Sequence, residues 1–248
     1  MNNYTYHEKQ IVEKYNTSFD SKDSFSFMND GYCDLDSNGF PCESTDIAWT
    51  EKFVLWKYQC NLYKKSLESA GVKPNTDQGT LLDLSCGHGG GLEFIKDYYK
   101  FKKLIGIDLN PTHIDLCKKH ITDVEFITAS ATDMPLESNS VDAITVIEAV
   151  PYFNPIEKFV LESQRILTQN GFLILTHPHR IDHSSYINHG YSLFYESDIT
   201  ENVRMSSAIS KYIMLNNKRN ILYECLFYDE FQFNHANVRY YLTVYQKN

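Results

Sequence analysis

The chain has 248 residues, of which 42% are hydrophobic and 14% aromatic, which is enough apolar material for one α/β domain with additions and excludes a disordered chain. A formal net charge of −9 argues against a nucleic-acid partner, and no apolar run is long enough to span a bilayer. We therefore expect a cytoplasmic protein with no membrane span, whose six cysteines are reduced.

The first 78 residues predict a cap in front of the main domain. Aromatic residues gather within residues 25–40, and this segment is expected to pack against the rest of the chain. Apolar residues recur with helical spacing over residues 46–70, before a glycine and a proline end the helix. The aromatic side chains of the cap could line an acceptor pocket or form core. We favour core for Trp49 and Trp56 and the pocket for Tyr32, and Phe27 stays open between the two.

Residues 79–248 predict the main domain, because short apolar runs alternate with helix-length segments as they do around a parallel sheet. Asn110 and Asn154, each followed by proline, are expected to cap two of these helices. The runs span residues 80–84, 104–109, 124–129, 141–147 and 171–177, and the helices lie near residues 91–99, 111–121 and 155–168.

The remaining segments complete the expected fold. Residues 178–218, with a helix near 198–210, predict a lid-like insertion. Residues 239–246 alternate as a strand does, and this strand is expected to close the sheet in the antiparallel direction. The predicted fold class is therefore α/β, a Rossmann-like, doubly wound, mostly parallel sheet with an antiparallel C-terminal strand and an N-terminal helical cap.

A glycine-rich turn, SCGHGGG, follows the first strand at residues 85–91. Gly87 and Gly89 permit positive φ angles and the close approach of a ligand. The dinucleotide pattern G-x-G-x-x-G fails because Leu92 stands at its last position, so a nicotinamide cofactor is the weaker alternative. A turn that serves packing alone is the other alternative.

Acidic residues stand at the ends of the next strands. Asp108, at the end of the second strand, can accept hydrogen bonds from both hydroxyls of a ribose. Asp133, after the third strand, can accept from an adenine amino group while Met134 covers the ring. The pattern therefore favours an adenosine-containing ligand at the carboxyl edge of the sheet.

In this order the segments resemble the type 11 family of class I methyltransferases, in the group that contains phenolphthiotriol dimycocerosates methyltransferases and microcystin O-methyltransferase. The shared words are SCGHGGG, IDLNP at residues 107–111, IEA at 147–149 and MNDGY at 28–32. The resemblance implies S-adenosyl-L-methionine as methyl donor, S-adenosyl-L-homocysteine as product, and O-methylation of a lipid, polyketide or other small acceptor. The cofactor-binding residues that it implies are Asp83, Ser85, Gly87, His88, Gly89, Asp108, Leu109, Thr132, Asp133, Met134 and Ile147.

The chain differs from those relatives at the position of their expected catalytic base. They carry Ser-His after the IEA word, where this chain has Val150 and Pro151. The candidates for the catalytic base are therefore His177, with His179 as the fallback, and Glu148. Each has a structural alternative, and we expect no metal at the histidines, since they lie on a predicted loop.

Several alternatives stay open at this point. The acceptor atom could be nitrogen or carbon, the chain could be a non-catalytic subunit that binds the donor, or it could be an oxidoreductase with a nucleotide cofactor. A homodimer is also open. We further expect residues 1–70 to cover the acceptor and not the donor, because the glycine turn and Asp108 already account for the donor.

Overall fold

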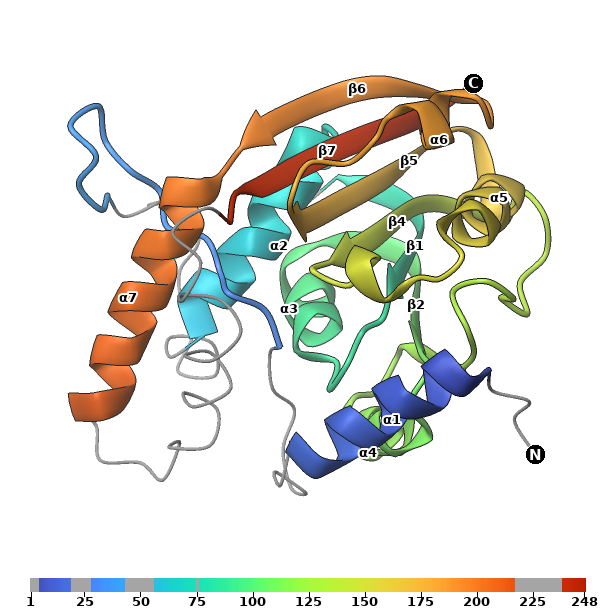
Figure 1. Ribbon diagram of the computed structural model, residues 1–248, viewed down its shortest axis with the longest axis horizontal. Helices are drawn as coiled ribbons and strands as arrows, with labels where there is room; N and C mark the ends of the chain where they lie inside the picture. Colours follow the sequence, from blue (N-terminus) through green and yellow to red (C-terminus); the bar gives the residue numbers. More distant parts are fainter. Residues whose placement is uncertain (1–4, 19–27, 43–55, 75, 217–237) are drawn as a thin grey trace.

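A seven-stranded sheet forms the centre of the computed structural model, which describes residues 5–18, 28–42, 56–74, 76–216 and 238–248 (Figure 1). The strand order is β3-β2-β1-β4-β5-β7-β6. β7 runs antiparallel to both of its neighbours, and the other pairs are parallel, which confirms the predicted class of sheet. The strands are β1 (Asp77–Leu84), β2 (Lys100–Asp108), β3 (Glu125–Thr128), β4 (Val141–Ile147), β5 (Leu167–Pro178), β6 (Tyr191–Asp198) and β7 (Tyr240–Lys247).

Helices cover both faces of the sheet, and two apolar cores result. One core joins Leu81 and Leu242 to Leu62 and Phe94 of the helices α2 and α3. The other joins Leu82 and Tyr245 to side chains of α5 and α6. The described helices are α1 (Tyr6–Ser18), α2 (Lys57–Ser69), α3 (Gly90–Tyr98), α4 (Pro111–His120), α5 (Ile156–Ile166), α6 (Ser184–Ile187) and α7 (Thr200–Asn216), with a 3-10 turn at Val150–Tyr152.

One of the two predicted caps is confirmed. The side chain of Asn110 accepts a hydrogen bond from the N–H of Thr112 at 3.0 Å, with Pro111 in the first turn of α4. The prediction for Asn154 is wrong, because Pro155 keeps an extended backbone and α5 begins only at Ile156, with no side-chain cap.

The structure describes only part of the predicted cap, both in its aromatic segment and in its helix. Tyr32 is buried, but Phe40 is 68% exposed, so the aromatic segment does not pack as a whole. The helix expected over residues 46–70 is observed as α2, which starts at Lys57. Phe25, Phe27, Trp49 and Phe53 lie outside the described residues.

Part of the range expected to form a lid-like insertion, residues 178–218, is observed in the sheet. Tyr191–Asp198 pair with β7 and form the edge strand β6, so this part of the range belongs to the core sheet. The helix expected nearby is observed as α7. Within the described ranges, no helix is long and apolar enough to cross a membrane.

Candidate functional site

The glycine turn joins β1 to α3 with a run of unusual backbone angles. Ser85, Gly87 and Gly89 have φ values of 62°, 54° and 81°, and Gly89 is the N-cap of α3. A Cβ atom on Gly87 would lie 2.7 Å from Sδ of Met28, so the space beside this glycine holds a cap side chain. The predicted need for glycine at Gly87 and Gly89 is therefore confirmed by backbone conformation and by packing, since a Cβ on Gly89 would lie 2.5 Å from Cδ1 of Ile121.

The carboxylate of Asp108 ties this turn to the end of β2. One oxygen accepts from the N–H of Gly87 at 2.9 Å, and the other accepts from the N–H of Asn110 at 2.8 Å. His113 Nδ1 lies 3.3 Å from the second oxygen. Because a carboxylate offers about four acceptor positions, Asp108 retains capacity for the hydroxyls of a ligand.

Aromatic rings line the space next to the turn. The ring of His88 lies 4.7 Å from that of His113, which in turn lies 6.1 Å from Tyr15 of α1. Burial lowers the pKa of His88 to about 4, so its imidazole is neutral at physiological pH. His88 therefore offers no cationic charge here.

Asp83 lies beneath the turn and is only 1% exposed. Its carboxylate accepts from the hydroxyl of Thr145 at 2.7 Å and from that of Tyr63 at 3.1 Å, which joins β1 to β4 and α2. Burial raises the pKa of Asp83 to about 7, although these two hydrogen bonds lower it. The residue therefore links three elements at the floor of the site.

The loop after β3 carries the other predicted ligand-binding side chains. Ser130 Oγ lies 2.9 Å from the hydroxyl of Thr132, and the N–H of Asp133 donates to the carbonyl of Ser130 at 3.2 Å. The carboxylate of Asp133 is exposed, as a ligand-binding group should be. The side chain of Met134 is instead 2% exposed and lies in the core beneath.

The helix α1 covers the ends of three strands from outside. Glu8 accepts from the hydroxyl of Ser130 after β3, and Asn16 accepts from the side chain of Asn110 after β2 at 2.8 Å. The Tyr15 ring lies 5.9 Å from Tyr152, after β4. Figure 1 shows α1 beside α4. The expectation that residues 1–70 cover the acceptor and not the donor stays a prediction, and for α1 these contacts argue against it, because they reach loops that are expected to bind the donor.

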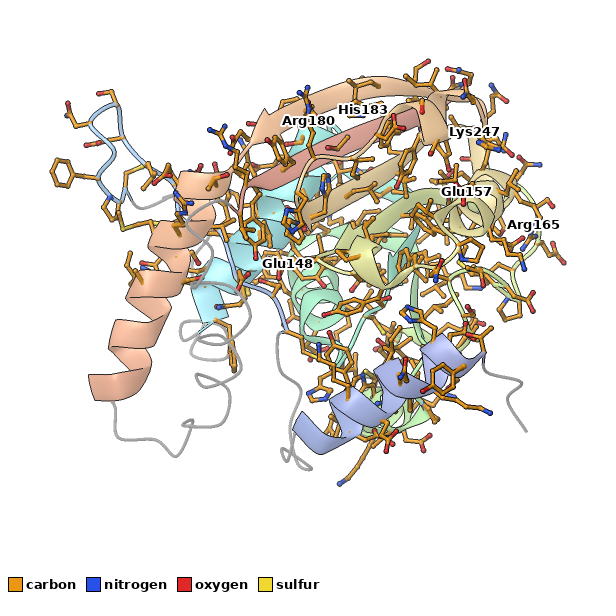
Figure 2. All side chains as sticks on the ribbon, viewed as in Figure 1. Glu148, Glu157, Arg165, Arg180, His183 and Lys247 are labelled. Carbon is orange, nitrogen blue, oxygen red and sulfur yellow. The ribbon has the colours of Figure 1, made fainter. Side chains whose placement is uncertain are left out.

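Glu148 follows β4 with a φ of 58°, is half-buried, and is labelled near the middle of the view in Figure 2. Both of its carboxylate oxygens lie 3.2 Å from the N–H of Asp30, which donates to them. Burial, together with the nearby charge of Asp30, raises the pKa of Glu148 well above its ordinary value. Ile147, just before it, lines the core that faces α2.

Asp30 itself was not among the predicted site residues, although it falls in the shared word MNDGY beside the pocket candidate Tyr32. The hydroxyl of Tyr240 on β7 donates to the carboxylate of Asp30, and Ser206 on α7 donates to its carbonyl at 2.9 Å. Cap, sheet and α7 therefore meet beside Glu148.

The three histidines at the end of β5 and after it do not form a cluster. His177 is 1% exposed, and its Nδ1 lies 2.7 Å from the carbonyl of His179, to which it must donate, because a carbonyl only accepts. Its Nε2 then accepts from Thr243 at 3.2 Å, and burial lowers the pKa of His177 to about 4. His179 is exposed, and His183 contacts Tyr245 and Glu196. Across the described residues, no group of three or more potential ligands is arranged for a metal ion.

Comparison with known proteins shows what this chain is similar to. Residues 82–175 match the model of a family described as a methyltransferase domain. A fatty-acid O-methyltransferase of Mycolicibacterium smegmatis is 26% identical over 170 residues, which cover 68% of this chain and 58% of the relative. A phthiotriol/phenolphthiotriol dimycocerosates methyltransferase of Mycobacterium leprae is 28% identical over 153 residues, which cover 61% of this chain and 53% of the relative. The chain thus spans little more than half the length of these curated relatives.

A solved structure is similar in fold over nearly the whole chain. Geranyl diphosphate C-methyltransferase from Streptomyces coelicolor, in complex with Mg2+, geranyl diphosphate and S-adenosyl-L-homocysteine, aligns with a TM-score of 0.68 at 13% identity. The alignment covers 98% of this chain and 99% of that chain. Residues 82–175, which include the glycine turn and Asp108, are thus similar to a methyltransferase domain, and the fold of the chain is similar to that of a solved methyltransferase.

Proposed function

We propose that this chain transfers a methyl group from S-adenosylmethionine to a hydroxyl or carboxyl oxygen of a small or lipid-like acceptor. The observation that carries the proposal is the pairing of a donor site built on Asp108 with a part-buried carboxylate, Glu148, at the end of a neighbouring strand. The names of the two curated relatives, one a fatty-acid O-methyltransferase, support a lipid-like acceptor.

The donor would bind along the carboxyl edge of β1, β2 and β3. Asp108 would accept from the ribose hydroxyls and Asp133 from the adenine amino group, since both keep acceptor capacity. The turn at residues 85–89 and the side chain of Ile147 would border the remainder of the donor. When bound, the donor supplies an electrophilic methyl group on a sulfonium with a neutral leaving group, so this chain's own residues contribute mainly orientation and exclusion of water.

Glu148 is the candidate base that the geometry supports best. Burial raises the pKa of Glu148, so its ionised carboxylate is a stronger base than an ordinary one, and the Asp30 N–H fixes its two oxygens. His177 is the weaker candidate, because both of its ring nitrogens already have partners. His179 is exposed and stays the fallback. An acceptor that is already ionised, such as a fatty-acid carboxylate, would need no base.

The acceptor would lie on the face of the sheet that α2 and α7 cover. We propose the division into a cap of residues 1–78 and a core of residues 79–248, with the buried Tyr32 and the segment around Asp30 bordering the acceptor. The protein is further proposed to act in the cytoplasm on a small molecule and not on nucleic acid, and a homodimer stays an open alternative.

The test is product analysis with a donor that carries a labelled methyl group. The purified chain would be incubated with fatty acids, phenols and isoprenoid diphosphates, and the products compared by mass spectrometry. Label on oxygen supports the proposal, and label on carbon or nitrogen favours the alternative chemistry, for which the C-methyltransferase likeness is an argument. Donor binding without transfer to any acceptor would favour the alternative of a non-catalytic subunit. Binding of NADH without binding of the donor would favour the alternative of an oxidoreductase.

A further inference from the structure

Two side chains of α5 hold the loop after β3 by its main chain. Glu162 Oε2 accepts from the N–H of Met134 at 3.0 Å. Arg165 donates from Nη2 to the carbonyl of Met134 at 2.9 Å and from Nη1 to the carbonyl of Leu136 at 2.7 Å. Both peptide groups that flank Met134 are therefore fixed from the same helix. We call Glu162 and Arg165 the α5 clamp.

The α5 clamp is also bonded within itself. Arg165 Nε lies 2.8 Å from Glu162 Oε1, and Nη2 lies 2.9 Å from Oε2, so the guanidinium meets the carboxylate with two parallel hydrogen bonds. The hydrogen bond from Arg165 is the main cause that lowers the pKa of Glu162, so the pair is ionised at neutral pH. An ion pair this exposed contributes little to stability by itself. Its contacts with three main-chain groups are what distinguish it from an ordinary surface pair.

Both ends of this attachment are anchored. Phe159, Val160 and Ile166 of α5 are fully buried, which fixes the helix against the sheet. The side chain of Met134 is buried in the same core. Asp133 lies between the clamped peptide of Met134 and the Ser130 carbonyl that its own N–H contacts, so the clamp fixes the main chain that carries its exposed carboxylate. Arg165 lies at the periphery in Figure 2, away from Glu148.

We propose that Glu162 and Arg165 are positioning residues for donor recognition, which set the preference for adenine by holding Asp133 in place. The inference rests on the proposed function, in which Asp133 accepts from the adenine amino group. Neither clamp residue touches the donor. Their loss should therefore weaken discrimination between bases more than it weakens the folded state.

The experiment compares the affinities of S-adenosylhomocysteine and S-inosylhomocysteine, in which an oxygen replaces the amino group. The unchanged chain should prefer the adenine compound, since a lost or mismatched hydrogen bond to a charged group costs roughly tenfold in affinity. Arg165→Ala and Glu162→Gln should each reduce this ratio at least threefold. Arg165→Lys should restore it only in part, because lysine cannot contact two carbonyls and the carboxylate with a planar fork.

Arg204→Ala is the matched control. Arg204 and Glu201 on α7 form another pair with the same spacing and the same 2.8 Å separation, and this variant should leave the ratio unchanged. If folded Arg165→Ala and Glu162→Gln both keep the ratio of the unchanged chain, the inference is overturned and the proposed function stands. If the unchanged chain binds neither compound, or binds both equally, the proposed role of Asp133 is overturned and the inference falls with it.

Discussion

Asp108 is the residue on which donor binding should depend most, because its carboxylate holds the glycine turn and is proposed to accept from the ribose. We expect Asp108→Ala to weaken the binding of S-adenosylhomocysteine by about 1–3 kcal/mol through lost charge-assisted hydrogen bonds. Titration calorimetry measures this directly. Asp115→Ala, at an exposed position on α4, is the control and should bind as the unchanged chain does. Equal affinities of both variants would contradict the assignment of the donor site.

The identity of the base can be read from the pH dependence of the rate. Glu148 accepts a proton only when ionised, so the rate should fall as pH drops through its raised pKa. Glu148→Gln should lower the rate with a hydroxyl acceptor by about 10² or more, remove that acidic limb and leave donor affinity nearly unchanged.

His177→Ala supplies the contrast for this experiment. If Glu148 is the base, the histidine variant keeps the acidic limb. If His177 is the base, its lowered pKa of about 4 sets the limb, and His177→Ala should cost at least about tenfold in rate. An unchanged rate and pH profile in both variants would mean that neither Glu148 nor His177 is the base. His179→Ala would then be tested next.

At the scale of elements, α1 makes the contacts that call for a test. Glu8 and Asn16 bond to loops after β3 and β2, so the double variant Glu8→Ala/Asn16→Ala should raise the Kd for S-adenosylhomocysteine by up to about thirtyfold, at about 1 kcal/mol for each hydrogen bond. The KM for the acceptor should change little. Lys9→Ala, at an exposed position of the same helix, is the control. A rise in the acceptor KM with an unchanged donor Kd would mean that α1 serves the acceptor after all.

The elements of the core were predictable because their apolar runs are short and buried on both faces, as for β4, whose predicted limits are the observed ones. α1 escaped prediction because it packs through polar side chains and not through an apolar stripe. Its signal was a capping box, in which Thr5 and Glu8 bond to each other's main-chain N–H groups. β6 escaped because it is an edge strand with exposed Leu193 and Phe194, which hides the alternation of a half-buried strand.

The candidate site was predictable where a backbone conformation or a strand end specifies a residue, as at Gly87 and Asp108. It was not predictable where the partner is distant in sequence. Asp30 meets Glu148 and Tyr240 only because the sheet order brings β4 and β7 close to the cap. Nε2 of His177 on β5 likewise contacts Thr243 on the neighbouring antiparallel strand β7.

At the scale of the whole molecule, the buried Asp83 joins β1, β4 and α2 and should make stability depend on pH. Its pKa in the folded protein is about 7, against 3.8 for the ordinary group, so the folded state binds the proton more tightly than the unfolded chain does. The protonated form therefore favours folding, and this contribution is lost as pH rises from about 4 through 7. Asp83→Asn keeps a neutral group of the same size at every pH. In the ligand-free protein, the free energy of unfolding of Asp83→Asn, relative to that of the unchanged chain, should therefore be higher at pH 8 than at pH 5. Urea denaturation at both pH values measures this difference.

Asp115→Asn, at an exposed position, is the control, and its free energy of unfolding relative to the unchanged chain should be the same at both pH values. A difference between Asp83→Asn and the unchanged chain that is the same at both pH values would mean that Asp83 is already ionised in the folded protein at pH 5, with Tyr63 and Thr145 compensating fully for its burial.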